Sequence, residues 1–387
     1  MENFRFQCAT KIIFGKGTES FVGKEVGKLT NKILLHYGGG SIKKYGLYDK
    51  IIKLLKEESI EIVELAGVKP NPRLSMVGKG IELCRKNKVE LILAVGGGSV
   101  IDSAKAISIG VNYNGNVWDF YTGKERAKKA LPVGVVLTIP AAGSESSPGS
   151  VITKEEGSYK RPYVDNIIRP RFAILNPEIS YTLPPYQTAC GVVDIMAHIM
   201  ERYFTTVSNV DLTDRLCEAA LKTMIKNAPV VLKKKDDYNA RAEIMWTGTV
   251  AHTDLLETGR IGDWGSHDIE HELSGIYDIA HGAGLAVIFP AWMKYVYKKD
   301  IQKFVQFAVR VWNIEYDFDN KGKMVFEGIK RLKEFFKQIG MPVSLKELNI
   351  NSDRFDEMSR KATENGPLGN FMKLSKEDVF NIYKLSQ

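Results

Sequence analysis

The first half of the chain alternates short apolar segments with segments of helical periodicity, and this alternation restricts the possible folds most strongly. The apolar segments are rich in valine, isoleucine and leucine, and they occupy residues 32–37, 60–65, 90–95 and 133–138. Strands separated by helices are typical of a parallel sheet, because a parallel crossover needs a connection of that length. We therefore predict a parallel, Rossmann-like α/β domain over residues 1–184.

The pattern changes after Pro184 and Pro185, where helix follows helix. Apolar side chains there recur at steps of three and four residues, which is the period of one helix face. One such series comprises Val325, Ile329, Leu332, Phe336 and Ile339. A chain of 387 residues with 44% hydrophobic and 26% charged residues is long enough for two cores. We predict an all-α domain over residues 185–387.

Histidine is scarce in this chain, yet three of its six histidines lie within fifteen residues. Asp194 and His198 are four residues apart, and so are His267 and His271, which places each pair on one helix face. His281 follows in a glycine-flanked segment. Neutral imidazole is the commonest protein ligand of divalent metals. The pattern predicts an open site for Fe(II) or Zn(II), and the spacing leaves open which of the five side chains bind it.

Each of these residues also has an ordinary structural interpretation. A single histidine in an apolar helix is more often a core or surface residue than a ligand, and Asp194 with His198 can be a helical ion pair. We interpret His36 and His252 as structural. Residues 188–204 are predicted to form a helix, and Ser266 is predicted to cap the helix that begins at His267.

A glycine turn follows the third apolar segment. Residues 91–95 lead into Gly96, Gly97, Gly98 and Ser99, and a helical pattern begins at Val100. Glycines let backbone N–H groups approach a pyrophosphate, and the helix amino terminus favours its negative charge. A flexible turn is the competing interpretation, and Ser99 with Asp102 also fits a capping box.

Two further turns strengthen the prediction of a dinucleotide site. Residues 33–37 lead into Gly38, Gly39, Gly40 and Ser41, with Lys43 and Lys44 in the next turn. The turn offers no acidic side chain for a ribose 2′-hydroxyl, so NADP(H) is favoured over NAD(H), although the lysines can simply be solvated. The fourth apolar segment leads into a third turn, which contains Thr138, Gly143 and Ser144.

Composition excludes several other classes of protein. The four cysteines, Cys8, Cys84, Cys190 and Cys217, are widely scattered, which favours a reducing, cytoplasmic compartment over a disulfide framework. Residues 1–6 lack the apolar core of a signal peptide, and no apolar run approaches the roughly twenty residues that cross a bilayer. The net charge of +8 is spread over short lysine groups, so neither nucleic acid nor membrane is expected as a partner.

These elements in this order resemble the iron-containing, group III alcohol dehydrogenase family over essentially the whole chain, and within it the butanol dehydrogenases and aldehyde reductases. Single glycine turns are weak signals, whereas the turns together with the Asp and His set are specific. The resemblance rests on the segments at residues 14–17, 38–44, 67–72, 94–102, 143–145, 194–198, 267–274 and 278–282.

The resemblance implies a dehydroquinate synthase-like fold with a dinucleotide-binding domain, a helical metal-binding domain and an active site in the cleft between them. Asp194, His198, His267 and His281 match the family's metal ligands. His271 matches a histidine that is not a ligand and acts in proton relay or substrate placement. The positions that match cofactor-binding residues are Gly39, Gly40, Ser41, Gly97, Gly98, Ser99, Asp102, Thr138, Ser144 and Lys160.

The activity implied is hydride transfer between NAD(P)(H) and short- to medium-chain primary alcohols or aldehydes, of which butanol and butanal are the type. A glycerol or polyol dehydrogenase is the nearby alternative, and a metal-dependent lyase of the dehydroquinate synthase type is a more distant one. A nucleotide-binding sensor without catalysis is disfavoured because all five metal and relay positions are present. The resemblance and the edge strands of the sheet together favour a homodimer.

Overall fold

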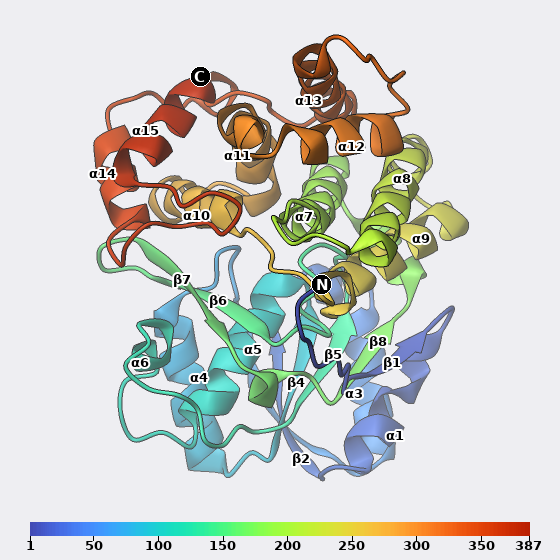
Figure 1. The fold of residues 1–387 in the computed structure, drawn as a ribbon. Coiled ribbons are helices and arrows are strands. Elements are labelled where there is room, and N and C mark those ends of the chain that lie inside the picture. Colours follow the sequence, from blue (N-terminus) through green and yellow to red (C-terminus); the bar gives the residue numbers. More distant parts are fainter. The chain divides into compact units, whose positions relative to one another are not determined.

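The computed structural model describes all 387 residues, and the chain forms two compact units (Figure 1). One unit contains residues 7–183 and 235–249, and the other contains residues 1–6, 184–234 and 250–387. The chain thus passes from one unit to the other next to residue 184. Residues 235–249, which follow the predicted boundary, pack with the first unit.

The first unit is built on a six-stranded parallel sheet. Its strands in spatial order are β1 (Lys11–Phe14), β8 (Phe172–Leu175), β5 (Val133–Leu137), β4 (Leu91–Gly96), β2 (Lys32–Tyr37) and β3 (Glu61–Leu65). The four apolar segments expected from the sequence are therefore strands, and the prediction of a parallel α/β domain is confirmed. The two short strands β1 and β8 escaped prediction, as did the antiparallel hairpin of β6 (Gly149–Lys154) and β7 (Tyr159–Val164).

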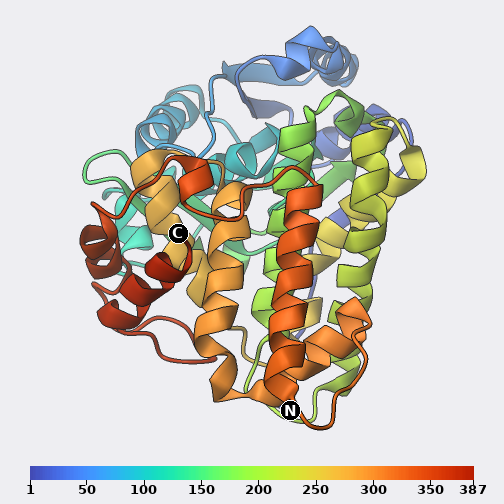
Figure 2. The same cartoon turned by 90° about the horizontal axis from the view of Figure 1, so that it is seen from above.

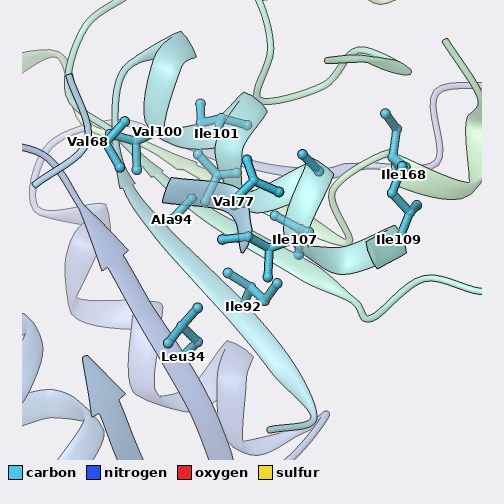
Figure 3. Close-up of a cluster of buried hydrophobic side chains, with 14 of the residues drawn as sticks. Leu34, Val68, Val77, Ile92, Ala94, Val100, Ile101, Ile107, Ile109 and Ile168 are labelled. Carbon is cyan, nitrogen blue, oxygen red and sulfur yellow. The ribbon is translucent and has the colours of Figure 1, made fainter. Parts of the chain in front are cut away.

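Helices cover both faces of this sheet, because successive strand residues point to opposite sides and both sides are apolar. Leu34 and Ile92 belong to one core cluster, which includes residues of α4 (Leu74–Asn87) and α5 (Gly98–Gly110) (Figure 3). Ile33 and Leu93 belong to the other cluster, with residues of α1 (Val22–Gly27) and α3 (Leu47–Glu57). The remaining helices of this unit are α2 (Ser41–Lys44), α6 (Trp118–Tyr121) and most of α9 (Tyr238–Ala251).

The second unit is helical, as predicted. Its long helices run side by side (Figure 2), and α7 packs against both α8 and α11. The α-helices of this unit are α7 (Pro185–Tyr203), α8 (Asp211–Lys233), α10 (Gly265–Tyr277), α11 (His281–Val296), α12 (Ile301–Trp312), α13 (Lys321–Gln338), α14 (Phe355–Ala362) and α15 (Lys376–Leu385). The apolar series at residues 325–339 is buried along α13 and its carboxyl end. None of the helices is both long and apolar enough to cross a membrane.

Candidate metal centre and nucleotide turns

Helix α7 supplies the first pair of predicted ligands. It begins at Pro185, where the missing N–H costs no hydrogen bond, and it extends to Tyr203, so the helix predicted over residues 188–204 is confirmed. Asp194, His198 and Glu201 follow one another at steps of four and three residues and are all buried. The helix therefore presents a carboxylate, an imidazole and a second carboxylate on one face.

Helices α10 and α11 supply the other histidines. Helix α10 begins at Gly265, two residues before His267, and His281 is the first residue of α11. The predicted cap at Ser266 is wrong, because this hydroxyl lies inside the helix and donates to Glu201 Oε1 at 2.5 Å. The serine is thus engaged with α7 rather than with its own helix terminus.

The structure brings Asp194, His267 and His281 together. One ligand atom from each of these three residues lies within 4.8 Å of the other two. Asp194 Oδ1 is 4.0 Å from His281 Nε2, and the ring of His198 is centred 4.6 Å from that of His267. Four side chains that are up to 87 positions apart in the chain therefore meet in one small region, as a shared cation would require.

The Nδ1 atom of each candidate histidine already has a partner. His198 Nδ1 lies 2.9 Å from the carbonyl oxygen of Asp194, His267 Nδ1 lies 2.7 Å from Glu201 Oε1, and His281 Nδ1 is bonded to Glu270. Such contacts fix the tautomer and the orientation of a ring, and they leave Nε2 available to a metal. Carboxylates of Glu201 and Glu270 thus orient two of the three rings, those of His267 and His281.

Two atoms of this group are buried without a well-aligned hydrogen bond: His267 Nε2 has no partner, and Asp194 Oδ1 has only the ion-pair contact of His198 Nδ1 at 3.0 Å. A buried polar atom without a partner costs about 1–3 kcal/mol, so orphans are rare in native proteins. Both atoms are lone-pair donors of the kind that bind Fe(II) or Zn(II). The residues present therefore fit a divalent cation.

The electrostatics of the group agree with this fit. Burial alone would raise the pKa of Asp194, but the neighbouring His198, His281 and His267 hold it well below its ordinary value. Burial, together with His198 and His281, holds the pKa of His267 well below its ordinary value. The carboxylate is thus ionised and this imidazole neutral, which are the protonation states that a metal needs.

Two neighbouring histidines complete the cluster. The ring of His271 is stacked on His281 with centroids 5.6 Å apart, and His252 lies 4.5 Å from His198. His36 lies on β2 of the sheet-containing unit and has both ring nitrogens hydrogen-bonded, as a structural histidine should. His252 lies 2.6 Å from Arg202 through its Nδ1 atom, and its interpretation as structural stays a prediction. Sequence reasoning missed the carboxylates Glu201 and Glu270. The available signal was their spacing, since each glutamate follows a candidate histidine by three residues.

The glycine turns lie in the sheet-containing unit, at the carboxyl ends of adjacent strands. From β2 the chain runs outward to β3, whereas from β4 it runs through β5 to β8 on the other side. Ligands of doubly wound sheets bind where the strand order reverses in this way, here between β2 and β4. The turns at residues 38–41 and 96–99 stand at this place, and the N–H of Thr138 donates to the carbonyl of Gly96 at 3.0 Å.

The glycines of these turns serve two different purposes. A Cβ atom at Gly97 would come within 2.9 Å of Ile139, so that residue is small for packing. A Cβ at Gly39 or Gly40 would meet nothing within 4 Å, and one at Gly98 would meet only Ala142 at 3.4 Å. The turn before α2 is therefore open at Gly39 and Gly40, and the turn before α5 has room at Gly98, which suits the close approach of a phosphate.

The residues next to the first turn include a carboxylate that the sequence did not reveal. Glu64 of β3 accepts hydrogen bonds from the hydroxyl groups of Tyr37 and Tyr48, and the ammonium group of Lys43 lies over both rings at 5.3 and 4.5 Å. Ser41 is the first residue of α2. Lys43 is thus engaged in a local cluster.

The other predicted cofactor residues lie on α5 and in the segment after β5. Ser99 is in the first turn of α5. The predicted capping box of Ser99 and Asp102 is wrong. The Asp102 carboxylate instead accepts hydrogen bonds from the hydroxyl of Ser144 (2.6 Å) and the N–H of Val151 (3.0 Å). Ser144 is buried, and Lys160 is a buried residue of β7. Asp102 therefore holds a loop rather than its own helix end.

Comparison with known proteins explains the presence of both groups in one chain. Residues 9–177 match the family model described as iron-containing alcohol dehydrogenase, and residues 188–386 match the carboxyl-terminal model of the same family. The chain belongs to the iron-containing alcohol dehydrogenase family. The fold and the pairing of a metal group with nucleotide turns are thereby accounted for.

Relatives within the family match over the full length of the chain. A probable NADH-dependent butanol dehydrogenase of Bacillus subtilis is 44% identical and the NADH-dependent butanol dehydrogenase A of Clostridium acetobutylicum 42% identical, each with complete coverage of both chains. The NADPH-dependent aldehyde reductase of Escherichia coli is 36% identical over 95% of this chain and 94% of its own. The crystal structure of a Thermotoga maritima NADH-dependent butanol dehydrogenase superposes with a TM-score of 0.96 at 42% identity, covering 100% of this chain and 99% of the other.

Proposed function

We propose that this protein interconverts short- to medium-chain primary alcohols and aldehydes of the butanol and butanal type, using NAD(P)(H) and one divalent metal. The observation that carries the proposal is the convergence of ligand atoms from Asp194, His267 and His281, among which the buried His267 Nε2 has no hydrogen-bond partner. The full-length likeness to butanol dehydrogenases and an aldehyde reductase supports the choice of substrate.

We assign Asp194, His198, His267 and His281 as the metal ligands. When bound, the metal supplies a Lewis acid for the substrate oxygen, and the nicotinamide takes or gives the hydride. Glu201 and Glu270 keep the rings of His267 and His281 oriented through their Nδ1 atoms. Such support fixes the geometry before substrate arrives.

His271 has a different task in this proposal. The match to the family places it outside the ligand set, and its ring stacks on that of His281. In the oxidation of an alcohol His271 receives the proton of the substrate hydroxyl, and in the reduction of an aldehyde it returns it. An imidazole can do both because it changes between a neutral and a protonated form.

The cofactor is assigned to the three turns at the reversal of the strand order. Gly39, Gly40 and Ser41 would lie against the adenosine ribose, and Gly97, Gly98 and Ser99 against the pyrophosphate. Thr138, Ser144 and Lys160 border the same edge, and Asp102 contributes through the loop that it holds. Residues 38–44 contain no acidic side chain, and the neighbouring Glu64 carboxylate already accepts hydrogen bonds from the hydroxyl groups of Tyr37 and Tyr48. A 2′-phosphate is therefore acceptable at this turn, and NADP(H) keeps a slight preference over NAD(H).

The decisive experiment follows the absorbance of the reduced cofactor. Metal-free protein is reconstituted with Fe(II) or Zn(II) and mixed with butanal and NADPH or NADH. Oxidation of the cofactor that depends on both metal and aldehyde is expected. Absence of turnover with any short aldehyde, together with oxidation of glycerol in the reverse assay, would move the assignment to a polyol dehydrogenase.

We also infer a homodimer and a cytoplasmic location. Strand β1 is the outer strand of the sheet, and beside it the partly exposed rings of Phe14 and Trp246 meet edge-on at 6.0 Å. An unpaired strand edge with exposed aromatic residues favours pairing with a second copy. All four cysteines are free thiols, which supports a reducing compartment. Light scattering after gel filtration tests the dimer, and a monomer at micromolar concentration refutes it.

A further inference from the structure

A buried lysine on α5 is the main anchor of the loop that follows β5. Lys105 is fully buried, and its ammonium group donates to three backbone carbonyls, those of Ser144 (2.6 Å), Ser147 (2.9 Å) and Gly149 (2.8 Å). It also lies within 3.0 and 3.3 Å of the hydroxyl oxygens of Ser144 and Ser147. One side chain thus fixes both ends of a short loop.

Asp102 lies on the same face of α5 as Lys105, because residues three positions apart are neighbours on a helix. It binds the same segment of the chain. Its carboxylate receives the Ser144 hydroxyl and the Val151 N–H, and its carbonyl receives the Ser150 hydroxyl at 2.9 Å. Residues 144–151 are therefore fastened to α5 from beginning to end. Arg169 reinforces the middle through the carbonyl of Ser146 at 2.5 Å.

Helix α5 is a firm support for this clamp. Its other side carries Val100 and Ile107, which belong to the buried core cluster that also contains Ile92 and Ala94 of β4 (Figure 3). The same helix begins at the glycine turn of residues 96–99, which we assign to the pyrophosphate. Through Lys105 the position of the loop is tied to the position of that turn.

The charge of Lys105 is opposed by its burial. Burial lowers the pKa of Lys105 to about 8, although Asp102 and Glu145 counteract the shift. The protonated form is therefore disfavoured by folding, and an apolar side chain would avoid this cost. The ammonium group makes five contacts to the loop, and these offset the cost of burying its charge.

We propose that Lys105, together with Asp102, is a positioning residue that holds the loop of residues 143–151 in the form that binds the nicotinamide cofactor. The proposal rests on the assignment of Ser144 to the cofactor site. The change that tests it is Lys105→Met, which keeps the length of the side chain and removes its charge. The matched control is Ser103→Ala, which removes an equally buried hydrogen bond of α5, that to His36 Nε2 at 2.9 Å, without touching the loop.

Three measurements are made on the metal-loaded proteins. Fluorescence titration gives the dissociation constant of NADPH, hydrogen exchange of the cofactor-free protein reports the order of residues 143–151, and steady-state kinetics give both KM values. For Lys105→Met we expect NADPH binding at least tenfold weaker, faster exchange confined to the loop, and a KM for butanal within twofold of wild type. Ser103→Ala should bind NADPH within twofold of wild type even if its Tm falls.

Binding of NADPH to Lys105→Met within twofold of wild type would overturn the proposal, and so would an equal loss in Ser103→Ala. If Lys105→Met does not fold, Ser147→Ala is tested instead, because it removes one acceptor of the Lys105 ammonium group. This variant should show faster hydrogen exchange in the loop and a two- to fivefold lower affinity for NADPH. Faster exchange with an unchanged affinity for NADPH overturns the proposal. A wild-type protein that binds neither NADPH nor NADH refutes the proposed function instead. In that case unchanged exchange in Lys105→Met shows separately that the lysine does not hold the loop.

Discussion

Replacing Glu201 by glutamine should weaken metal binding although Glu201 is not assigned as a ligand. Its Oε1 accepts from the Ser266 hydroxyl (2.5 Å), the His267 N–H (3.1 Å) and His267 Nδ1 (2.7 Å), while Oε2 accepts from the Trp264 N–H (2.6 Å). An amide can preserve the three bonds at Oε1. Its NH2 group then faces the Trp264 N–H, so two donors meet and the side chain must move.

The size of the effect follows from the role of the carboxylate. It holds the Nδ1 proton of His267 and so aims Nε2, and loss of such outer support typically costs 10–100-fold in metal affinity. That range corresponds to about 1.4–2.8 kcal/mol. The buried donor pair lowers the free energy of unfolding by about 1–3 kcal/mol as well. Metal affinity and stability should therefore fall together in Glu201→Gln.

Competition with a chromophoric chelator measures the affinity for Zn(II), and urea unfolding of the metal-free protein measures stability. The control is Glu218→Gln on α8, a buried glutamate that accepts from the Tyr203 hydroxyl at 3.0 Å. It should lose stability and keep its Zn(II) affinity within twofold. A normal affinity in Glu201→Gln, or an equal loss in Glu218→Gln, would refute the reasoning.

Three further outcomes are expected. His271→Ala should keep one metal per chain by elemental analysis and lose turnover at least a hundredfold, whereas His281→Ala should lose its metal; full metal in the latter would contradict its role as a ligand. Isothermal titration should show NADPH binding at least as tight as NADH, because the turn from Gly38 to Lys44 lacks an acidic residue, and a clear preference for NADH would contradict this. Between pH 8 and 10.5 the unfolded chain binds more protons at Lys105 than the folded chain does. The free energy of unfolding of wild type should therefore rise relative to that of Lys105→Met by roughly 3 kcal/mol over this range. Urea unfolding at several pH values measures this difference, and a difference that stays constant would rule out a buried charge.

The central strands were predictable because they are buried on both faces. β4 and β5 contain only apolar residues and glycine, and β2 is apolar except for Lys32 and His36. Glycine or threonine stands at or just after the end of each strand. β1 and β8 have four residues each, and the hairpin of β6 and β7 mixes lysine, serine and tyrosine with apolar residues. Such segments form strands because they pair with neighbouring strands, and a local sequence pattern carries no information about that pairing.

The sequence predicted the candidate site only to the extent that residue spacing within one helix determines it. The steps from Asp194 to His198 and from His267 to His271 place side chains on helix faces, but they do not say which faces meet. The supporting glutamates show the limit, because Glu201 lies one turn from His198 and supports His267 on another helix. Ser266 and Asp102 were misread for the same reason, since both look like local caps and both serve a segment that is distant in the sequence.

The two assigned sites share a physical logic that follows from these long-range contacts. In the helical unit, His267 Nε2 is buried without a partner beside the Asp194 carboxylate, and in the sheet-containing unit the ammonium group of Lys105 is buried. Burial opposes a polar or charged group in both places. Folding alone therefore does not explain these side chains, whereas a bound cation or an ordered cofactor loop does. Residues that reduce stability while orienting neighbouring groups are where function is best sought in this chain.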